Sequence, residues 1–255
     1  MKLSVALITL NEEQNLQRTL ESVRAVADEI IVVDSGSTDK TIEIAHEYNA
    51  KTFFQSWPGY GKQKNFALAQ CSGDWILLID ADEELSKELS AKIHWIINNE
   101  KEKKVFSINR SSICFGKELK YGGWSNQYAV RLWQKGKVQV NENLVHENYI
   151  TSEKIYKISE KIYHHTYHTL QDYFVRFNTY TTLGAQEYYK RGKKVSFLKI
   201  VLNPTYKFIR MYIIRGGFLD GVEGFMIARA SALYSMTKYF KLREMYRNGS
   251  YNSSK

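Results

Sequence analysis

Two aspartates separated by one residue, Asp80 and Asp82, end an apolar run at residues 75–79 that is typical of a buried strand. Residues two apart in an extended or turning segment project to the same side. Two carboxylates so placed can hold one hard divalent cation, Mg²⁺ or Mn²⁺, and that cation can bridge a diphosphate. The spacing alone is weak evidence, but its position at the end of a strand favours a metal–diphosphate site over a solvated loop.

A second carboxylate, Asp34, follows another apolar run, residues 29–33. A carboxylate at the end of a strand can accept hydrogen bonds from ribose hydroxyls or from a base N–H. Its alternative role is to cap the helix that begins near residue 41. Ser37 and Asp39 can cap that helix themselves, so we expect Asp34 to be left free for a ligand.

Residues 59–65, Gly-Tyr-Gly-Lys-Gln-Lys-Asn, offer backbone N–H groups and two lysines that could cradle a phosphate. The segment is not a Walker A loop, because Gln63 stands where Ser or Thr would follow Gly-Lys. No Gly-x-Gly-x-x-Gly fingerprint follows the first expected strand, which disfavours a dinucleotide-dependent dehydrogenase.

A reaction that transfers a group from a diphosphate to a hydroxyl needs a base that takes the proton of that hydroxyl. Residues 141–147 contain two candidates, Glu142 and Glu147, beside His146, an imidazole that could complete a metal shell. Taken singly, these residues would more often lie on the surface. They gain a function only if the fold brings them to Asp82.

The elements that must position these side chains alternate between strand and helix in the first half of the chain. We expect buried strands at residues 3–9, 29–33, 51–55 and 75–79, and helices at 11–26, 41–48 and within 59–69. This alternation predicts an α/β fold with a doubly wound, mostly parallel sheet, whose ligands bind at the carboxyl ends of the strands.

Beyond residue 105 the pattern predicts further strands at 105–110 and 128–133, followed by a helical extension. Its helices are expected at 170–191, 204–215 and 221–246, with Asn203 as the cap of the second and Pro204 as its first residue. We therefore predict a catalytic domain over 1–165, a basic amphipathic helical extension over 166–247 and a loose tail over 248–255.

The net charge of +9 is unevenly distributed over the 255 residues. Residues 151–255 contain 18 Lys and Arg against 7 Asp and Glu, a net charge of +11, so residues 1–150 carry −2. In the expected helix from Pro204, Lys207 and Arg210 lie in a narrow arc amid aromatic and aliphatic residues. A surface of this kind lies on anionic lipid, although a core-facing helix with a solvated basic edge is the alternative.

Together these motifs resemble the family-2 inverting glycosyltransferases of the GT-A fold, and most closely the group that adds glucose or a similar hexose to the inner core of lipopolysaccharide. The resemblance rests on the opening strand and its loop at 4–12, on Val-Asp-Ser-Gly-Ser-Thr-Asp at 33–39, on Gly-Lys-Gln-Lys-Asn at 61–65 and on Asp-Ala-Asp at 80–82. It also rests on Gly-Gly-Trp at 122–124, Arg-Leu-Trp at 131–133, Val-His-Glu at 145–147 and Gly-Phe-Leu-Asp-Gly at 217–221.

The resemblance implies a role for each matching residue. The nucleotide-sugar would be bound by Thr9, Asn11, Glu12, Asp34, Lys64, Asp80 and Ala81. The metal, Mg²⁺ or Mn²⁺, would be held by Asp82 with Asp80 and His146. Trp124 and Arg131 would lie on the acceptor side, and Glu147, with Glu142 as its competitor, would be the catalytic base.

The function implied is the transfer of a hexose, with glucose favoured, from a UDP-sugar to a lipid-anchored glycan such as the lipopolysaccharide core. The enzyme would be cytoplasmic, associated peripherally with the inner face of the cytoplasmic membrane, and would not bind nucleic acid. Three alternatives stay open: a family-2 enzyme acting on capsule or exopolysaccharide precursors, a sugar nucleotidyltransferase, and a basic nucleic-acid-binding protein. The sequence leaves the hexose, the acceptor and the oligomeric state undetermined.

Overall fold

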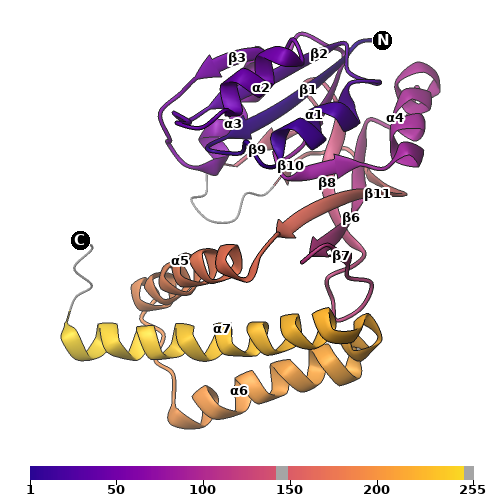
Figure 1. Ribbon diagram of the computed structural model, residues 1–255. Helices are drawn as coiled ribbons and strands as arrows, with labels where there is room; N and C mark the ends of the chain where they lie inside the picture. Colours follow the sequence, from indigo (N-terminus) through magenta and orange to yellow (C-terminus); the bar gives the residue numbers. More distant parts are fainter. Residues whose placement is uncertain (142–148, 250–255) are drawn as a thin grey trace. The chain divides into compact units, whose positions relative to one another are not determined.

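The computed structural model describes residues 1–141 and 149–249 (Figure 1). The chain divides into two compact units. The first, called the sheet unit here, contains Met1–Ser111 and Asn126–His165, and the second, the helical unit, contains Ser112–Ser125 and Thr166–Lys255. The segment Ser112–Ser125 thus groups with the helices, although it lies inside the predicted 1–165 domain.

The first half of the sheet unit is parallel. Its strands pair in the order β3-β2-β1-β4, with bounds β1 (Leu3–Thr9), β2 (Glu29–Asp34), β3 (Lys51–Phe54) and β4 (Trp75–Leu78). Three helices connect them: α1 (Leu16–Val23), α2 (Thr41–Glu47) and α3 (Tyr60–Gln70). Strands β1, β2 and β4 are buried almost throughout because apolar residues cover both faces, as the continuous apolar runs predict.

Two hydrophobic clusters cover the two faces of this sheet. Alternate residues of β1, among them Leu3, Val5 and Leu7, pack with Leu16 and Leu20 of α1. The opposite face packs instead with α3, and its cluster contains Ala6, Ile31, Ile76 and Ala67. Helix α1 is shorter than the predicted 11–26 because Asn11 takes a left-handed conformation with φ 55°, which no helix contains.

The second half of the sheet unit contains antiparallel strand pairs. The order continues β8-β6-β11-β5, and β8 is antiparallel to both β4 and β6, as β11 is to β5. The bounds are β5 (Glu83–Leu85), β6 (Val105–Cys114), β8 (Gln127–Gln134) and β11 (Ile155–Tyr167), with helix α4 (Lys87–Asn99) after β5. A separate short hairpin pairs β9 (Gln139–Val140) with β10 (Tyr149–Ile150).

The strand order places a switch point between β1 and β4. The chain runs outward from β1 to β2 and β3 on one side, and β4 lies on the other side of β1. Ligands of doubly wound sheets bind beyond the carboxyl ends of the strands at such a point. Thr9, Asp34 and Asp80 all stand at these ends, as the sequence predicts.

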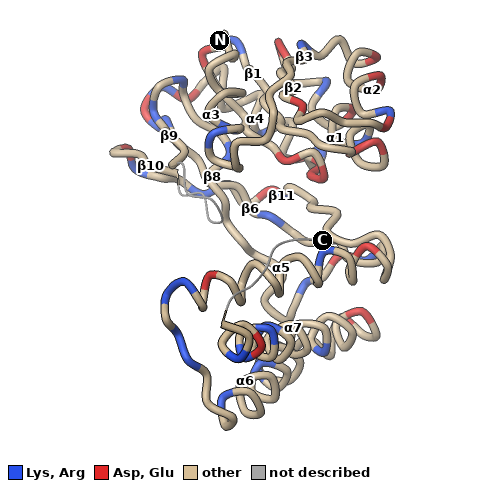
Figure 2. Tube along the Cα trace, turned by 90° about the vertical axis from the view of Figure 1, so that its left-hand side faces the viewer, with Lys and Arg blue, Asp and Glu red and all other residues tan. Residues whose placement is uncertain are grey.

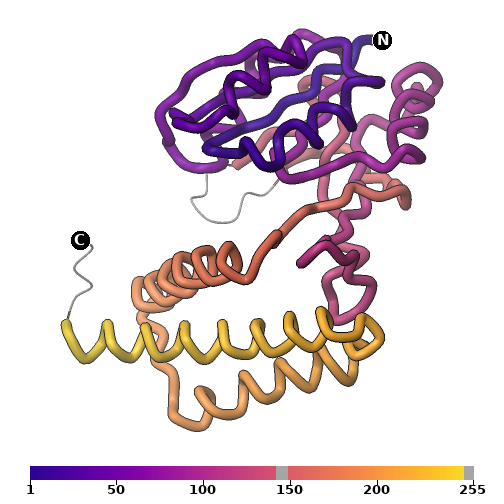
Figure 3. The backbone as a smooth tube through the Cα atoms, in the orientation of Figure 1, coloured from indigo at the N-terminus to yellow at the C-terminus, as the bar shows by residue number. Residues whose placement is uncertain are grey.

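In the helical unit, α7 (Gly221–Asn248) packs against both α5 (Leu170–Lys190) and α6 (Phe197–Ile209). Figure 3 follows the chain from α6 through a π-helical turn, η1 (Arg210–Ile214), and a 3₁₀ turn, η2 (Gly217–Asp220), back into α7. Two small cores hold the unit together, one around Met211 and Ile227 and one around Ala185 and Leu242. Strand β7 (Lys117–Glu118), in the same unit, pairs with Ile113 and Cys114 at the end of β6.

The start of α6 differs from the prediction. The helix begins at Phe197, where the Ser196 hydroxyl accepts a hydrogen bond from the backbone N–H of Lys199, and Pro204 lies inside it. Asn203 therefore does not cap the helix; its side-chain amide donates to the Tyr239 hydroxyl of α7. In the part of the chain that the structure describes, none of the helices combines the length and apolar character needed to cross a bilayer.

Candidate active site

A buried network of ion pairs lies at the carboxyl end of β4. Arg131, from β8, donates from Nη2 to Asp80 Oδ2 at 2.5 Å and to Glu83 Oε1 at 2.7 Å. Arg110, from β6, approaches the same Glu83 oxygen through Nε at 3.2 Å. The other Glu83 oxygen accepts the backbone N–H of Asp80 at 3.0 Å. One buried carboxylate thus fixes both the backbone of Asp80 and the guanidinium that neutralises it.

Asp80 is held ionised by its surroundings. Burial raises the pKa of this carboxyl, but the charges of Arg131, Lys64 and Arg110 outweigh that effect and hold the pKa well below its usual range. Lys64, on α3, places Nζ 3.3 Å from Asp80 Oδ1. Burial lowers the pKa of Arg131, but Asp80 and Glu83 raise it well above its ordinary value. The site therefore contains fixed positive charge beside a permanently ionised aspartate.

Asp82 faces a histidine that sequence reasoning did not single out. His164, on β11, places Nε2 3.2 Å from Asp82 Oδ2, and both side chains are largely buried. Arg110 Nη2 lies 2.7 Å from His164 Nδ1. The same Nη2 lies 3.0 Å from His164 Nε2. A guanidinium can only donate, so Arg110 can bond to whichever ring nitrogen carries no proton.

The Asp82–His164 pair meets the geometric requirement for two ligands of one cation. Neighbouring ligands of an octahedral ion with bonds near 2.1 Å lie about 3 Å apart, and the two atoms here are 3.2 Å apart. Among residues 1–141 and 149–249 there is no group of three His, Cys, Asp or Glu that could hold a metal. A cation held by Asp82 and His164 would therefore take its remaining ligands from water or from the diphosphate of a substrate, as Mg²⁺ commonly does.

Asp34 is not left free, and this expectation is wrong. Its Oδ1 accepts from the hydroxyls of Thr9 and Ser37 at 3.0 and 2.5 Å. Its Oδ2 accepts from the backbone N–H groups of Gly36 and Ser37, each at 2.7 Å. Four bonds fill the acceptor positions of a carboxylate. The residue orders the loop after β2, and Asp39 Oδ1 accepts the backbone N–H of Thr41 at the start of α2.

The loops after β1 and β2 are tied to each other. Asn11 donates its backbone N–H to the Ser37 hydroxyl at 2.8 Å and accepts the backbone N–H of Thr38 on Oδ1 at 2.9 Å. The backbone N–H of Glu12 donates to the Thr41 hydroxyl at 2.8 Å. Asparagine tolerates the left-handed conformation required at position 11 better than most residues. These bonds give the strand ends a fixed shape.

Of the remaining predicted residues, Ala81 is buried and its carbonyl accepts a hydrogen bond from the Thr19 hydroxyl at 2.7 Å. Trp124 belongs to the helical unit, where it packs against the cluster of Met211 and Ile227. Arg131 was predicted to lie on the side of the glycan acceptor. Its side chain is instead only 4% exposed and is bound to Asp80 and Glu83. Glu142, His146 and Glu147 lie outside the described residues.

The residues that the sequence did not reveal are Arg110, Glu83 and His164. Arg110 is a charged residue within the largely buried strand β6, and a charge in such a strand indicates that the side chain has a partner of opposite charge. His164 and His165 form a similar signal on β11, where His165 Nε2 lies 2.9 Å from Glu84 Oε2. The register of β11 on β5, with His164 opposite Glu83, brings these side chains to the Asp80–Asp82 segment.

Fold and site together define an α/β protein with an acidic strand end at the switch point of a doubly wound sheet. Residues 4–138 match the model of glycosyl transferase family 2, and the chain belongs to this family. This membership, with the sheet described above, confirms the predicted α/β fold of the GT-A type. It also removes the alternatives of a sugar nucleotidyltransferase and a nucleic-acid-binding protein.

Several proteins resemble the chain over nearly its whole length. An uncharacterized glycosyltransferase of Rickettsia bellii is 33% identical, covering 96% of this chain and 87% of the relative. The lipopolysaccharide core biosynthesis glycosyltransferase LpsC of Rhizobium meliloti is 29% identical, covering 96% of this chain and 93% of LpsC. A crystal structure of S. aureus TarS, residues 1–349, aligns with a TM-score of 0.48 at 19% identity, covering 99% of this chain and 93% of that one.

Proposed function

We propose that this glycosyltransferase moves a hexose, with glucose the favoured candidate, from a UDP-sugar to a lipid-anchored glycan of the lipopolysaccharide core type. The observation that carries the proposal is the Asp82–His164 pair beside the buried Asp80–Arg131–Lys64 network at the switch point. The likeness to LpsC, whose name states lipopolysaccharide core biosynthesis, supports the class of acceptor.

The donor would lie across the carboxyl ends of β1, β2 and β4. The loops of Thr9, Asn11, Glu12 and Asp34 would frame the nucleoside. Asp34 would contact the nucleoside only if one of its four hydrogen bonds were replaced. We expect this to be the bond from the Ser37 hydroxyl, because a hydroxyl rotates more readily than a backbone N–H. Asp80, Ala81 and Lys64 would face the ribose and the diphosphate, where the ammonium of Lys64 offsets phosphate charge.

Asp82 and His164 are the residues we propose for Mg²⁺ or Mn²⁺, in place of Asp82 with Asp80 and His146, since Arg131 and Lys64 already occupy Asp80. When bound, the ion would neutralise charge on the leaving diphosphate. Arg110 Nη2 lies against the ring of His164, 2.7 Å from Nδ1 and 3.0 Å from Nε2. For metal binding His164 would present Nε2 without its proton; Nδ1 would then carry the ring proton and could not accept from Arg110.

The reaction would invert the anomeric carbon. The acceptor oxygen forms a bond to that carbon on the face opposite the nucleotide, the bond from carbon to phosphate oxygen breaks, and UDP leaves with the bonding pair. The hydroxyl proton passes to a carboxylate. Glu147, with Glu142 as the alternative, is the base we propose from the sequence motif.

The helical unit is the part we propose to meet the membrane, at the inner face of the cytoplasmic membrane. On α6 and η1 the side chains of Phe197, Leu198, Ile213 and Ile214 are more than half exposed. Lys and Arg positions are frequent along α6 and α7 and in the segment that joins α5 to α6 (Figure 2). Apolar side chains with basic neighbours are what peripheral attachment to anionic lipid requires.

A donor panel tests the enzymatic proposal. Release of UDP from UDP-glucose and other UDP-hexoses should be saturable with Mn²⁺ or Mg²⁺, and Asp82→Ala should lose at least about a hundredfold in kcat/KM. The exposed Glu88→Gln at the start of α4 is the matched loss of a carboxylate and should leave turnover unchanged. Normal turnover of Asp82→Ala with saturating Mn²⁺ and UDP-glucose would refute the mechanism.

The acceptor needs a separate test. With the preferred donor, transfer should occur to a lipid-anchored core oligosaccharide, and product analysis should show a β linkage from the α-linked donor. Transfer to a capsule or exopolysaccharide precursor, with none to the core oligosaccharide, would instead favour a family-2 enzyme that acts on those precursors.

A further inference from the structure

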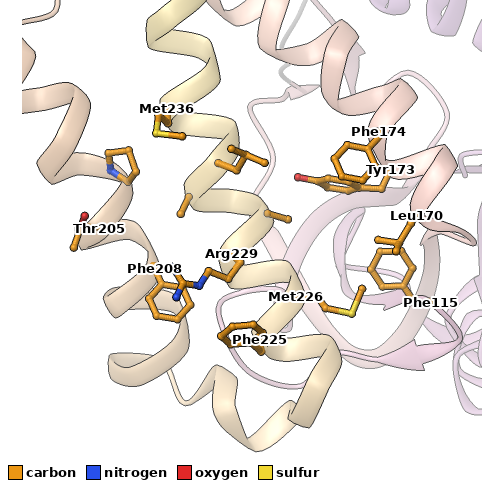
Figure 4. Close-up of a pocket in the computed structure, with 14 residues that line it drawn as sticks. Phe115, Leu170, Tyr173, Phe174, Thr205, Phe208, Phe225, Met226, Arg229 and Met236 are labelled. Atoms are coloured by element: carbon orange, nitrogen blue, oxygen red, sulfur yellow. The ribbon is translucent and has the colours of Figure 1, made fainter.

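A cavity of about 570 Å³ lies within the helical unit, among side chains from α5, α6 and α7 (Figure 4). Its volume falls within the range of small-molecule binding sites. All of its lining residues belong to the helical unit, and none is a residue of the candidate active site described above. It is therefore a second candidate site whose chemistry must be read from its own walls.

The walls are almost entirely apolar. Tyr173 and Phe174 of α5, Phe208 of α6, and Phe225 and Met236 of α7 line the space. A wall of aromatic rings and methionines favours a hydrocarbon occupant, because it offers dispersion contacts and few hydrogen-bond partners. Phe174 is 53% exposed, so the lining continues onto the surface of the same unit.

One charged residue, Arg229 of α7, stands in this wall. Its guanidinium lies over the ring of Phe208, 4.4 Å from the centroid, and near Phe225 at 5.5 Å. No salt bridge joins it to a carboxylate of residues 1–141 or 149–249. A guanidinium supported by aromatic rings, and not neutralised by an acid, presents its N–H groups to an anion such as a phosphate.

The room in the cavity depends on small side chains of α7. Ala230 and Ala232 line it with single methyl groups, between the larger Met226 and Met236. The apolar walls and the single cation together describe an amphiphile with a hydrocarbon chain and an anionic head. The exposed apolar residues of α6 lie in the same unit, which makes the bilayer the source of such a molecule.

We propose that this cavity binds one acyl chain of an anionic bilayer phospholipid, with the phosphate of the headgroup on Arg229. The proposal rests on the membrane attachment proposed above and deepens it: the exposed face would provide loose adsorption, and the cavity would provide a specific lipid site. It does not depend on the identity of the donor sugar or of the glycan acceptor.

The test uses the full chain and dihexanoyl phosphatidylglycerol below its micelle concentration, titrated by calorimetry. Binding should saturate at one lipid per chain. Ala230→Phe, which fills the cavity, and Arg229→Gln should each weaken it by about tenfold or more. Arg243→Gln removes the same charge from an exposed position further along α7 and should bind as the wild type does. Equal binding by Ala230→Phe, or equal binding of glycerol phosphate alone, would overturn the proposal.

Vesicles of equimolar phosphatidylcholine and phosphatidylglycerol separate this site from general attachment. Ala230→Phe should still sediment with the vesicles, through the exposed face, while it loses the short-chain lipid. Its circular dichroism and UDP release should match the wild type, and Arg229→Gln tests the site independently if Ala230→Phe does not fold. Saturation by a lipid-anchored saccharide, with none by phosphatidylglycerol, would also overturn the proposal, whereas loss of vesicle binding by the wild type would refute the membrane attachment itself.

Discussion

Glu83 shows how single residues hold this site. It is fully buried, yet it accepts from Arg131 and from the backbone of Asp80, and it forms an ion pair with Arg110. A buried charge is tolerated only when it is paired and hydrogen-bonded. The two arginines therefore depend on the carboxylates as much as the carboxylates depend on them, and truncating one member leaves the others uncompensated.

Replacing Arg131 by Met should lower the free energy of unfolding by about 3–5 kcal/mol, because Asp80 and Glu83 would lose their buried partner. Urea unfolding measures the change. The double variant Arg131→Met with Glu83→Gln should recover part of the loss, since one unpaired charge is removed with its partner. Wild-type stability for Arg131→Met would show that the network does not hold the strand ends.

Glu29 makes a prediction about pH. Burial raises the pKa of its carboxyl, but hydrogen bonds from Ser4, Lys51 and Ser72 outweigh this and lower the pKa from 4.5 to about 2. A carboxyl with a lowered folded pKa stabilises the protein above its unfolded pKa, and the stabilisation is lost as pH falls from about 4.5 toward 2.

Glu29→Gln should therefore flatten the acid limb of the stability curve and should cost about 1–3 kcal/mol at neutral pH. Urea midpoints across the acid range measure both effects. Glu47→Gln, an exposed change on α2, serves as the control and should leave the acid limb as it is. An unchanged acid limb for Glu29→Gln would assign the pH dependence to other groups.

At the scale of elements, α7 begins close against the turn that precedes it. A Cβ built on Gly224 would stand 2.0 Å from the carbonyl oxygen of Gly217 and 2.8 Å from Cβ of Asp220. Asp220 in turn accepts the backbone N–H groups of Lys120 and Tyr121 at 3.1 and 2.9 Å. Glycine at 224 thus allows η2 and the first turns of α7 to pack, and Asp220 ties the segment before Gly122 to them.

Gly224→Ala should lower the thermal midpoint by several degrees, because backbone atoms would have to move. Gly184→Ala, in α5, is the matched control: its new Cβ would meet only side-chain atoms, nearest the flexible Lys238 at 3.0 Å. There the gain in helix propensity, about 1 kcal/mol, should offset the contact. Equal midpoints for the two variants would show that the approach of Gly217 to α7 is not needed.

At the scale of the whole molecule, the charge asymmetry predicts where anionic lipid binds. Residues 151–255 carry +11 and residues 1–150 carry −2. Exposed charges are screened over about 10 Å at 0.1 M salt, so adsorption to vesicles that contain phosphatidylglycerol should weaken as salt is added. The apolar side chains of α6 should leave a residual affinity that salt does not remove.

Lys199→Gln with Arg210→Gln should weaken vesicle binding by about 1 kcal/mol for each charge, roughly fivefold per residue. Co-sedimentation with the same vesicles measures the change. Lys87→Gln with Lys101→Gln removes two exposed charges from the sheet unit and should have little effect. An equal loss from both pairs would indicate attraction by net charge alone, without a dedicated surface.

The parallel half of the fold could be predicted because its signals are local. Apolar runs mark β1, β2 and β4, and Asp34 and Asp80 each come directly after such a run. Helix α5 begins where predicted because Thr169 and Asp172 form a capping box within four residues of sequence. Helix α6 was placed wrongly because Pro204 suggested a start, whereas Ser196 caps the helix two turns earlier.

The residues of the candidate active site could be predicted from the sequence only in part. Asp80 and Asp82 were found from their spacing and their position after an apolar run, but the roles given to Asp34 and Arg131 changed because the sequence does not show which donors surround a carboxylate. His164 lies 82 positions beyond Asp82 and reaches it through the antiparallel register of β11 on β5. Nothing local to either residue encodes that meeting.

What the sequence determined by itself was the alternation of elements, the family and the acidic strand end, since these depend on residue type and short-range spacing. What only the tertiary structure decided was the partners: Arg131 on Asp80, His164 on Asp82 and Arg229 at an apolar cavity. Strand register and helix packing set these pairs, and both depend on contacts between residues far apart in the chain. A shift of one residue in the pairing of β8 or β11 would turn Arg131 or His164 to the other face of the sheet.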